Sequence, residues 1–369
     1  MKRIPGRLRQ NPILALLFGG AAPGSPVRPV LAWWGRAVHR CDNSPIFAAP
    51  LGAEVAHAAG KQLSPRLAVY LIASAVLATA TPALTAQDPG TLKVDVKLVN
   101  VFVTVTDARG APIANLQKEN FVLKEDGKEQ KIAIFDKESA LPLSIVLGVD
   151  TSLSTRKDLP LELTSAKKFA HTIVRPQDGL AVYKFSEEVN EVVPFTSDLK
   201  RIDAGIDRVR NGSATALYDA IFLGSHALSR RQGRKVMVVI TDGGDTMSQV
   251  DYKEALRAAQ EAEAIIYSII IVPIEASAGR DTGGEHALIQ ISADTGGKYY
   301  YATGLAQLDD AFRQISDELR TQYLLAYYPS QRYSRSDFRQ LKVDLANPPA
   351  GGPYQSHYRA GYYTHKNTF

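Results

Sequence analysis

The stretch L-S-I-V-L-G-V-D-T-S-L-S, from Leu143 to Ser154, carries a continuous apolar run directly into a polar loop. A second junction of this kind, V-M-V-V-I-T-D-G-G-D, runs from Val236 to Asp245. Short apolar runs without polar alternation are typical of strands buried on both faces, as in a parallel sheet. Asp150 ends the first run and Asp242 follows the second. Because the carboxyl ends of parallel strands meet at one edge of the sheet, we expect these two carboxylates to lie close together.

Hydroxyl side chains accompany the two aspartates. Ser152 and Ser154 lie two residues apart in the first loop, and Thr215 lies in the separate segment G-S-A-T-A-L-Y-D-A. Carboxylate and hydroxyl oxygens suit hard cations, and Mg²⁺ keeps waters in the positions that the protein leaves open. These five side chains therefore form a candidate cation site. The open alternative is that they are ordinary turn or helix-capping residues, since Asp, Ser and Thr favour both roles.

This pattern resembles the von Willebrand factor A (vWA) family, whose metal-ion-dependent adhesion site consists of D-x-S-x-S, a distant Thr and a distant Asp. None of the five positions is substituted. The resemblance implies Mg²⁺, with Mn²⁺ or Ca²⁺ as alternatives, held at Asp150, Ser152, Ser154, Thr215 and Asp242. Asp242 would act through a bound water, and the Thr215 loop would move relative to the ion. The ligand would be a protein that donates an Asp or Glu carboxylate to the ion. Asp219 and Asp245 are candidates for orienting these groups from behind.

The chain around these motifs alternates apolar strands with segments of helical spacing. We expect strands at 143–149, 180–185, 189–195, 236–240, 265–272 and 298–301, and helices at 161–173, 199–209, 216–228, 252–264, 287–293 and 305–319. Such alternation predicts an α/β fold with a mainly parallel sheet and helices on both faces. The resemblance implies that this Rossmann-like vWA domain covers residues 143–321.

The two flanks of this region have the period-two alternation of β-strands. The first flank, 91–137, begins with an alternating run at 92–106, followed by a strand at 121–124, a turn at 126–128 and a returning strand at 131–135. The second flank, 322–365, contains an alternating run at 338–345 and further strands expected at 322–328 and 358–363. Since each flank is small for an independent domain, we expect both to form one β-sandwich-like domain into which the vWA domain is inserted.

The net charge of +5 does not indicate a nucleic-acid partner. Residues 1–86 hold nine Lys or Arg and two acidic residues, so residues 87–369 hold 34 basic and 36 acidic residues. The body of the protein therefore has no excess of basic charge to attract nucleic acid. We interpret the local basic group Arg230, Arg231, Arg234 and Lys235 as a solvated helix end before a strand.

The leader, residues 1–86, has the features of an export signal from about residue 61 onward. Lys61 and Arg66 precede the apolar run Leu67–Leu77, and small residues at 78–80 and 84–86 offer cleavage points. This combination predicts secretion to the periplasm, cell envelope or exterior, with membrane attachment only if the leader stays uncleaved. Residues 1–60 are unusual before a signal peptide, which suggests that translation starts later. The only cysteine, Cys41, lies in this leader, so no disulfide can form within the chain.

Three classes of function remain to be compared. The first is an exported, non-catalytic module that binds a protein through a divalent cation. The second is a structural component of the cell envelope with an unused metal site. The third is a metal-dependent hydrolase, but the sequence contains no nucleophile-elbow, zincin or phosphate-loop motif. We therefore predict the binding module and no enzymatic activity.

Overall fold

The computed structural model describes residues 98–137, 141–272, 282–330, 337–348 and 352–364. The predictions for the leader, residues 1–86, fall outside these ranges, as does the first part of the run at 92–106. Within the described ranges, no helix is long and apolar enough to cross a membrane.

A six-stranded sheet forms the centre of the region between the two flanks. Its strands lie in the order β10-β9-β8-β5-β6-β7, and only the edge strand β7 runs antiparallel to its neighbour. The strands are β5 (Leu143–Asp150), β6 (Gly179–Phe185), β7 (Val189–Thr196), β8 (Arg234–Thr241), β9 (Ala264–Ile271) and β10 (Tyr299–Ala302). Every residue of β5 and β9 is buried, as expected for strands covered on both faces.

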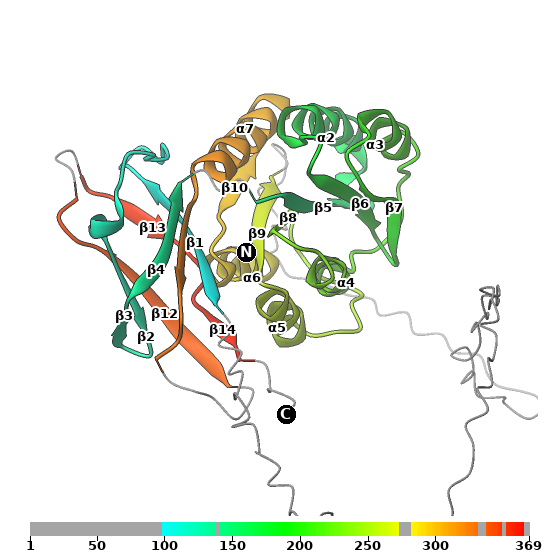
Figure 1. The fold of residues 1–369 in the computed structure, drawn as a ribbon. Coiled ribbons are helices and arrows are strands. Elements are labelled where there is room, and N and C mark those ends of the chain that lie inside the picture. The colour runs from blue at the N-terminus through cyan, green and yellow to red at the C-terminus, as the bar shows by residue number, and fades with distance from the viewer. Residues whose placement is uncertain (1–97, 138–140, 273–281, 331–336, 349–351, 365–369) are drawn as a thin grey trace, which may run out of the picture. The chain divides into compact units, whose positions relative to one another are not determined.

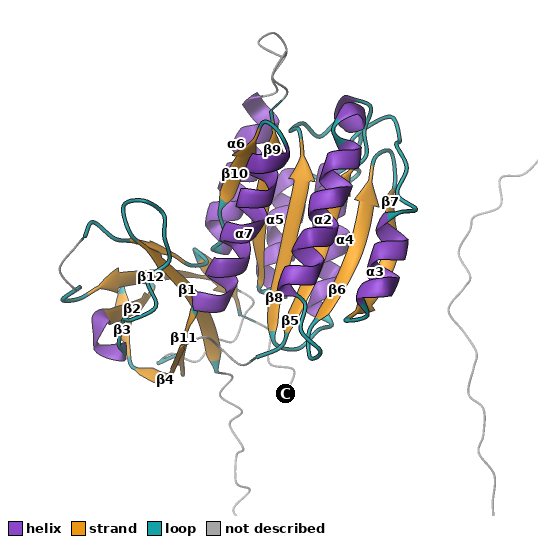
Figure 2. Ribbon diagram, turned by 90° about the horizontal axis from the view of Figure 1, so that it is seen from above, coloured by secondary structure: helices purple, strands orange, loops and turns teal. Residues whose placement is uncertain are grey.

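Helices cover both faces of this sheet, as Figures 1 and 2 show. One face packs against α2 (Leu159–Ile173), α3 (Leu199–Ile206) and α7 (Leu305–Thr321). The other packs against α4 (Leu217–Ser229), α5 (Tyr252–Ala262) and α6 (Thr282–Thr295). Alternate residues of each strand supply the two cores, so Ile145 and Leu147 face one helical layer while Val146 faces the other. The predicted α/β fold is confirmed.

The two flanks together form two four-stranded antiparallel sheets, whose buried residues share one hydrophobic core. One sheet has the order β13-β1-β11-β4, and the other has the order β14-β12-β2-β3. The strands are β1 (Val99–Thr106), β2 (Phe121–Glu125), β3 (Lys128–Gln130), β4 (Ile132–Lys137), β11 (Tyr323–Tyr327), β12 (Phe338–Leu345), β13 (Gln355–His357) and β14 (Gly361–Tyr363), with a 3₁₀ turn at Lys118–Asn120. Because β1 pairs with β11 and β2 pairs with β12, each sheet needs both flanks.

The hairpin after β2 differs from the sequence prediction. The strand that returns along β2 is the short β3, whereas residues 132–137 leave this sheet and pair with β11 as β4. Buried Gln130 marks the switch, because its side chain bonds to Ser330 and to the Lys128 carbonyl. The strand expected at 358–363 forms only at its end, as β14, while β13 lies just before it and belongs to the other sheet. Alternation reports which face a side chain takes, but not which sheet a strand joins.

The interpretation of the basic group at 230–235 as a solvated helix end was wrong for Arg234. This side chain is only 5% exposed and donates a hydrogen bond to the Leu319 carbonyl near the end of α7. Arg231 donates to Ser144 Oγ at 3.1 Å and lies over the Phe195 ring. The Arg234 guanidinium therefore caps the C-terminal end of α7, as cations near helix C-termini do.

Gly233 precedes β8 in a conformation that suits glycine. Its φ is +84°, and a Cβ there would lie 2.3 Å from the Pro142 carbonyl oxygen. We expect Gly233→Ala to reduce the free energy of unfolding by about 2 kcal/mol or more, since backbone strain and a clash act together. Gly127 is the matched control, because its φ is +78° but nothing lies within 4 Å of an added Cβ. Urea denaturation should show a loss of only about 1 kcal/mol for Gly127→Ala, and equal losses would contradict the clash.

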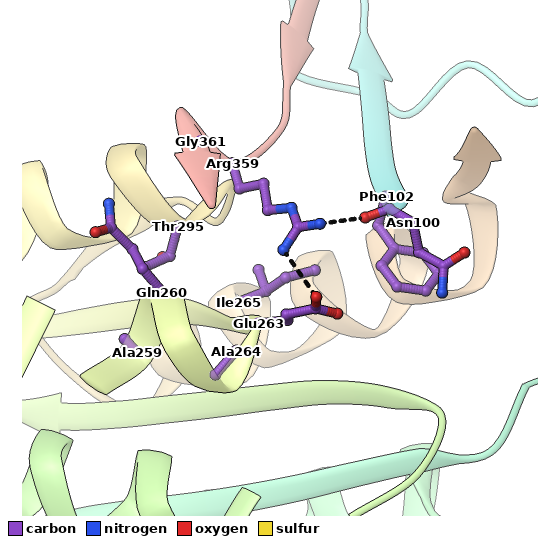
Figure 3. A pocket seen from close by; sticks show the side chains of 10 residues that line it. All are labelled: Asn100, Phe102, Ala259, Gln260, Glu263, Ala264, Ile265, Thr295, Arg359 and Gly361. Carbon is purple, nitrogen blue, oxygen red and sulfur yellow. Dashed lines mark hydrogen bonds and ion pairs between the residues drawn. The ribbon is translucent and has the colours of Figure 1, made fainter. Parts of the chain in front are cut away.

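Arg359 joins the β-sandwich-like domain to the vWA region (Figure 3). Its guanidinium donates to the Asn100 carbonyl at 2.6 Å and lies 3.5 Å from the Glu263 carboxylate. Asn100 belongs to β1, and Glu263 follows α5. The pocket around this pair is also lined by Phe102, Ile265 and Thr295. A single buried cation thus holds groups from both domains.

Candidate functional site

Asp150 ends β5 with its carboxylate fully buried, at 0% exposure. One oxygen, Oδ1, accepts a hydrogen bond from the Ser152 backbone N–H at 2.8 Å. The other, Oδ2, accepts from the Thr241 hydroxyl at 2.7 Å, across the neighbouring strand β8. The two bonds fix the plane of the carboxylate at the carboxyl end of the sheet. This is the edge at which the strand order predicted the site.

The D-x-S-x-S loop is folded back on itself so that its two serines meet. Ser152 Oγ lies 3.0 Å from Ser154 Oγ, with Ser152 buried and Ser154 exposed. The buried hydroxyl of Thr155 stabilises the turn, because it donates to the carbonyls of Asp150 and Ser152. A 3₁₀ turn at Ser154–Lys157 then leads to α2, whose N-cap Asp158 makes no side-chain capping bond. The capping alternative thus finds no support in either serine, because α2 begins at Leu159, five residues after Ser154, and its N-cap is Asp158.

Burial raises the pKa values of the two aspartates, and the charge of a neighbouring carboxylate adds to each rise, from Asp242 on Asp150 and from Asp158 on Asp242. Burial raises the pKa of Asp150 from 3.8 to about 6, which the bonds from Thr241 and Ser152 counteract and the charge of Asp242 reinforces. Burial also raises the pKa of Asp242, against a hydrogen bond with Ser154. Two carboxylates and two hydroxyls therefore share a region where a negative charge is poorly stabilised.

The Thr215 loop is tied to the loop that follows Asp242. The Thr215 N–H donates to Thr246 Oγ1 at 3.0 Å, and the Thr215 carbonyl accepts from the Thr246 N–H at 2.8 Å. The hydrogen bonds described for Thr215 thus come from its backbone. Its side chain is buried beside the start of α4.

The two candidates for orienting residues, Asp219 and Asp245, serve the same pair of loops. Asp219 accepts hydrogen bonds from the backbone N–H groups of Gln249 and Val250. Asp245 accepts from the Tyr218 N–H and from the Ser248 hydroxyl. Both carboxylates hold the loop at 245–250 against the beginning of α4.

Sequence reasoning missed two residues beside Asp150. Thr241, the last residue of β8, could have been noticed because it directly precedes Asp242 in the second motif. Glu162 lies in the first turn of α2, four residues before the buried Ala166, and its side chain is only 1% exposed. A charged residue on the buried stripe of an amphipathic helix is the signal that could have identified it. Burial raises the pKa of Glu162 to about 9, and the charge of Asp150 adds to this rise.

The chemistry of this donor set fits a hard divalent cation. Asp150, Ser152, Ser154 and Asp242 offer only oxygen atoms as ligands. The neighbouring charges that raise the pKa values of Asp150 and Glu162 are all carboxylates. A cation would offset both the burial that chiefly raises the pKa values of Asp150 and Glu162 and the repulsion that adds to it. No cluster of three or more His, Cys, Asp or Glu side chains suited to a metal occurs in the ranges given above, so hydroxyl ligands would be needed beside the two aspartates.

Residues 145–244 match the family model of the von Willebrand factor type A domain, and this range contains all five candidate residues. This part of the chain is similar to that domain. No curated protein matches the sequence. The strand order and the helices on both faces described above agree with the vWA fold.

Several solved structures are similar to the chain. The conserved hypothetical protein BatB from Bacteroides thetaiotaomicron shares 19% identity, covering 48% of this chain and 100% of that one, with a TM-score of 0.40. A von Willebrand factor type A protein from Catenulispora acidiphila shares 11% identity over 70% of this chain and 73% of that one, with a TM-score of 0.43. The vWF domain of the type V pili tip protein Mfa5 from Porphyromonas gingivalis shares 12% identity over 48% and 95%, with a TM-score of 0.40.

Proposed function

We propose that this protein is a non-catalytic protein-binding module that depends on a divalent cation, Mg²⁺ or alternatively Mn²⁺ or Ca²⁺. The observation that supports this most directly is the oriented, buried carboxylate of Asp150 beside the paired hydroxyls of Ser152 and Ser154. Burying an ionised carboxylate is unfavourable unless a positive charge or strong donors compensate for it. A cation supplies that charge, and its remaining coordination position is open to an oxygen from a partner.

Each residue has a distinct part in this proposal. Asp150 anchors the cation, and the hydroxyls of Ser152 and Ser154 contribute neutral oxygens. Thr215 approaches from its own loop, and Asp242 acts through a bound water. The set brings only two carboxylates close to the ion, so a third from an Asp or Glu of the partner protein remains favourable. The positive charge of the cation is what attracts and orients that carboxylate.

Two alternative functions lack a supporting observation. A hydrolase would need a base that activates its nucleophile, and the sequence holds none of the motifs that bring the two together. A structural envelope component with an unused site would not need the Thr241 and Ser152 bonds that orient the Asp150 carboxylate. We further propose that the module acts outside the cytoplasm, on the evidence of the signal-like leader at residues 61–86.

The test of this function is the thermal unfolding of the full-length protein with Mg²⁺ or Mn²⁺ and with a chelator. We expect either ion to raise the Tm, because a ligand that binds only the folded state stabilises it, by about 2.7 kcal/mol at 100 times its Kd. Asp150→Ala should abolish the rise. Glu261→Gln, which changes an exposed acid on α5, should retain it.

A second measurement concerns the carboxylate position. With Mn²⁺ bound, adding a short Asp-containing peptide should lower the proton relaxation of water, because the peptide displaces a water from the ion. A metal-induced rise in Tm without this displacement would support the cation site but contradict the proposed carboxylate ligand. No rise in Tm and no Mn²⁺ binding would refute the proposed function as a whole.

A further inference from the structure

The Glu162 carboxyl group lies buried in the first turn of α2, and neither of its oxygens has a hydrogen-bond partner within the described ranges. Its side chain is 1% exposed, so bulk water does not supply the missing bonds. Buried polar groups in folded proteins nearly always have partners, and a carboxyl group without one is costly. A group in this position therefore needs a partner that the described part of the chain does not provide.

The location of Glu162 indicates where that partner binds. Glu162 shares the sheet-facing stripe of α2 with Leu159 and Ala166. It lies eight residues after Ser154, the last residue of the D-x-S-x-S motif. The charges that act on it most strongly are those of Asp150, Asp158 and Asp242. Two of these three belong to the candidate cation site. Glu162 thus lies within electrostatic range of that site, on the buried face of the helix that follows the D-x-S-x-S loop.

We propose that Glu162 is a positioning residue of the cation site and accepts a hydrogen bond from a water bound to the buried side of the cation. This inference rests on the proposed function, because it requires a cation at Asp150. Mg²⁺ and Mn²⁺ retain waters when the protein supplies few ligands, and such a water needs an acceptor. Carboxylates that lie behind the direct ligands commonly orient them and strengthen metal binding.

A purely structural role does not explain the same observations. A structural carboxylate would accept bonds from backbone N–H groups, as Asp219 does, or pair with a cation, as Glu318 does with Lys298 at 2.5 Å. Glu162 does neither. Replacing it with an apolar side chain should therefore favour the metal-free fold while weakening the metal-bound one. A structural role predicts that both would be destabilised together.

The experiment compares the full-length wild-type protein with Glu162→Leu and Glu162→Gln. We expect Glu162→Leu to weaken Mn²⁺ binding at least about tenfold, measured by electron paramagnetic resonance, since loss of such partners weakens metal affinity 10- to 100-fold. In chelator its Tm should rise above that of the wild type. Glu162→Gln retains an acceptor oxygen, so its Mn²⁺ affinity should lie between those of the wild type and the leucine variant.

Asp158→Asn is the control for a general loss of negative charge near the site. Asp158 is a second nearby acid whose charge acts on both Glu162 and Asp242. We expect this variant to weaken Mn²⁺ binding much less than Glu162→Leu does. Equal losses, an unchanged affinity in Glu162→Leu, or a lower Tm of that variant in chelator would overturn the assignment. If the wild type itself binds no Mn²⁺, the proposed function fails. If the wild type binds Mn²⁺ and the Glu162 variants bind it equally well, only this inference fails.

Discussion

Replacing Phe169 with alanine is expected to destabilise the vWA domain by about 3–5 kcal/mol, the usual loss for a large aromatic side chain in a core. Phe169 is 2% exposed, and its ring stacks on Phe312 with centroids 4.6 Å apart. The two rings join α2 to α7 over one face of the sheet. An alanine would leave a cavity between two helices that are held by strands beneath them, so the site can collapse only in part.

Denaturation in urea, followed by circular dichroism, measures this loss. Leu161→Ala is the matched control, because Leu161 belongs to the same helix but is 41% exposed. The control should lose less than about 1 kcal/mol. A loss of similar size in both variants would mean that α2 is not anchored through its Phe169 face.

The second large effect is the pH dependence of the metal-free protein. The pKa of Asp150 rises from 3.8 to about 6 and that of Glu162 from 4.5 to about 9 in the folded state. A group whose pKa is raised by folding stabilises the fold fully below its unfolded pKa, and this contribution is lost as the pH rises through the folded pKa. The Asp150 shift alone corresponds to roughly 3 kcal/mol, lost between about pH 4 and pH 6. The Glu162 contribution continues to fall towards pH 9.

In chelator, the free energy of unfolding should therefore be several kcal/mol lower at pH 8 than at pH 5. Mg²⁺ should reverse this trend, because it favours the ionised carboxylates and competes with protons at low pH. Asp150→Asn should flatten the part of the profile between pH 4 and pH 6. A free energy of unfolding that stays constant or increases from pH 5 to pH 8 in chelator would show that folding does not raise the pKa values of these carboxyl groups.

The positions of Asp150 and Asp242 could be anticipated because strand ends are readable from apolar runs and parallel strands end at one edge. The same reasoning gave the central sheet and the helices on both faces. Thr241 and Glu162 required more, since their importance depends on the register between β5 and β8 and on the rotation of α2. Neither quantity is encoded in a local pattern. The division of residues 128–137 between β3 and β4 was hidden for a similar reason, because pairing partners lie far away in the sequence.

The pairing of β1 with β11 also sets an order of events during synthesis of the chain. Val101 lies opposite Leu325, so the first strand cannot find its neighbour until the whole vWA domain has been made. Until then, the inward valines of β1 remain exposed, and contacts between such distant residues form slowly. The vWA sheet contains all of its own strands and can fold first, bringing the ends of β5 and α7 into place. Folding of the inserted domain thus brings the two flanks together so that their strands can pair. Variants that slow its folding should leave the flanks prone to aggregation.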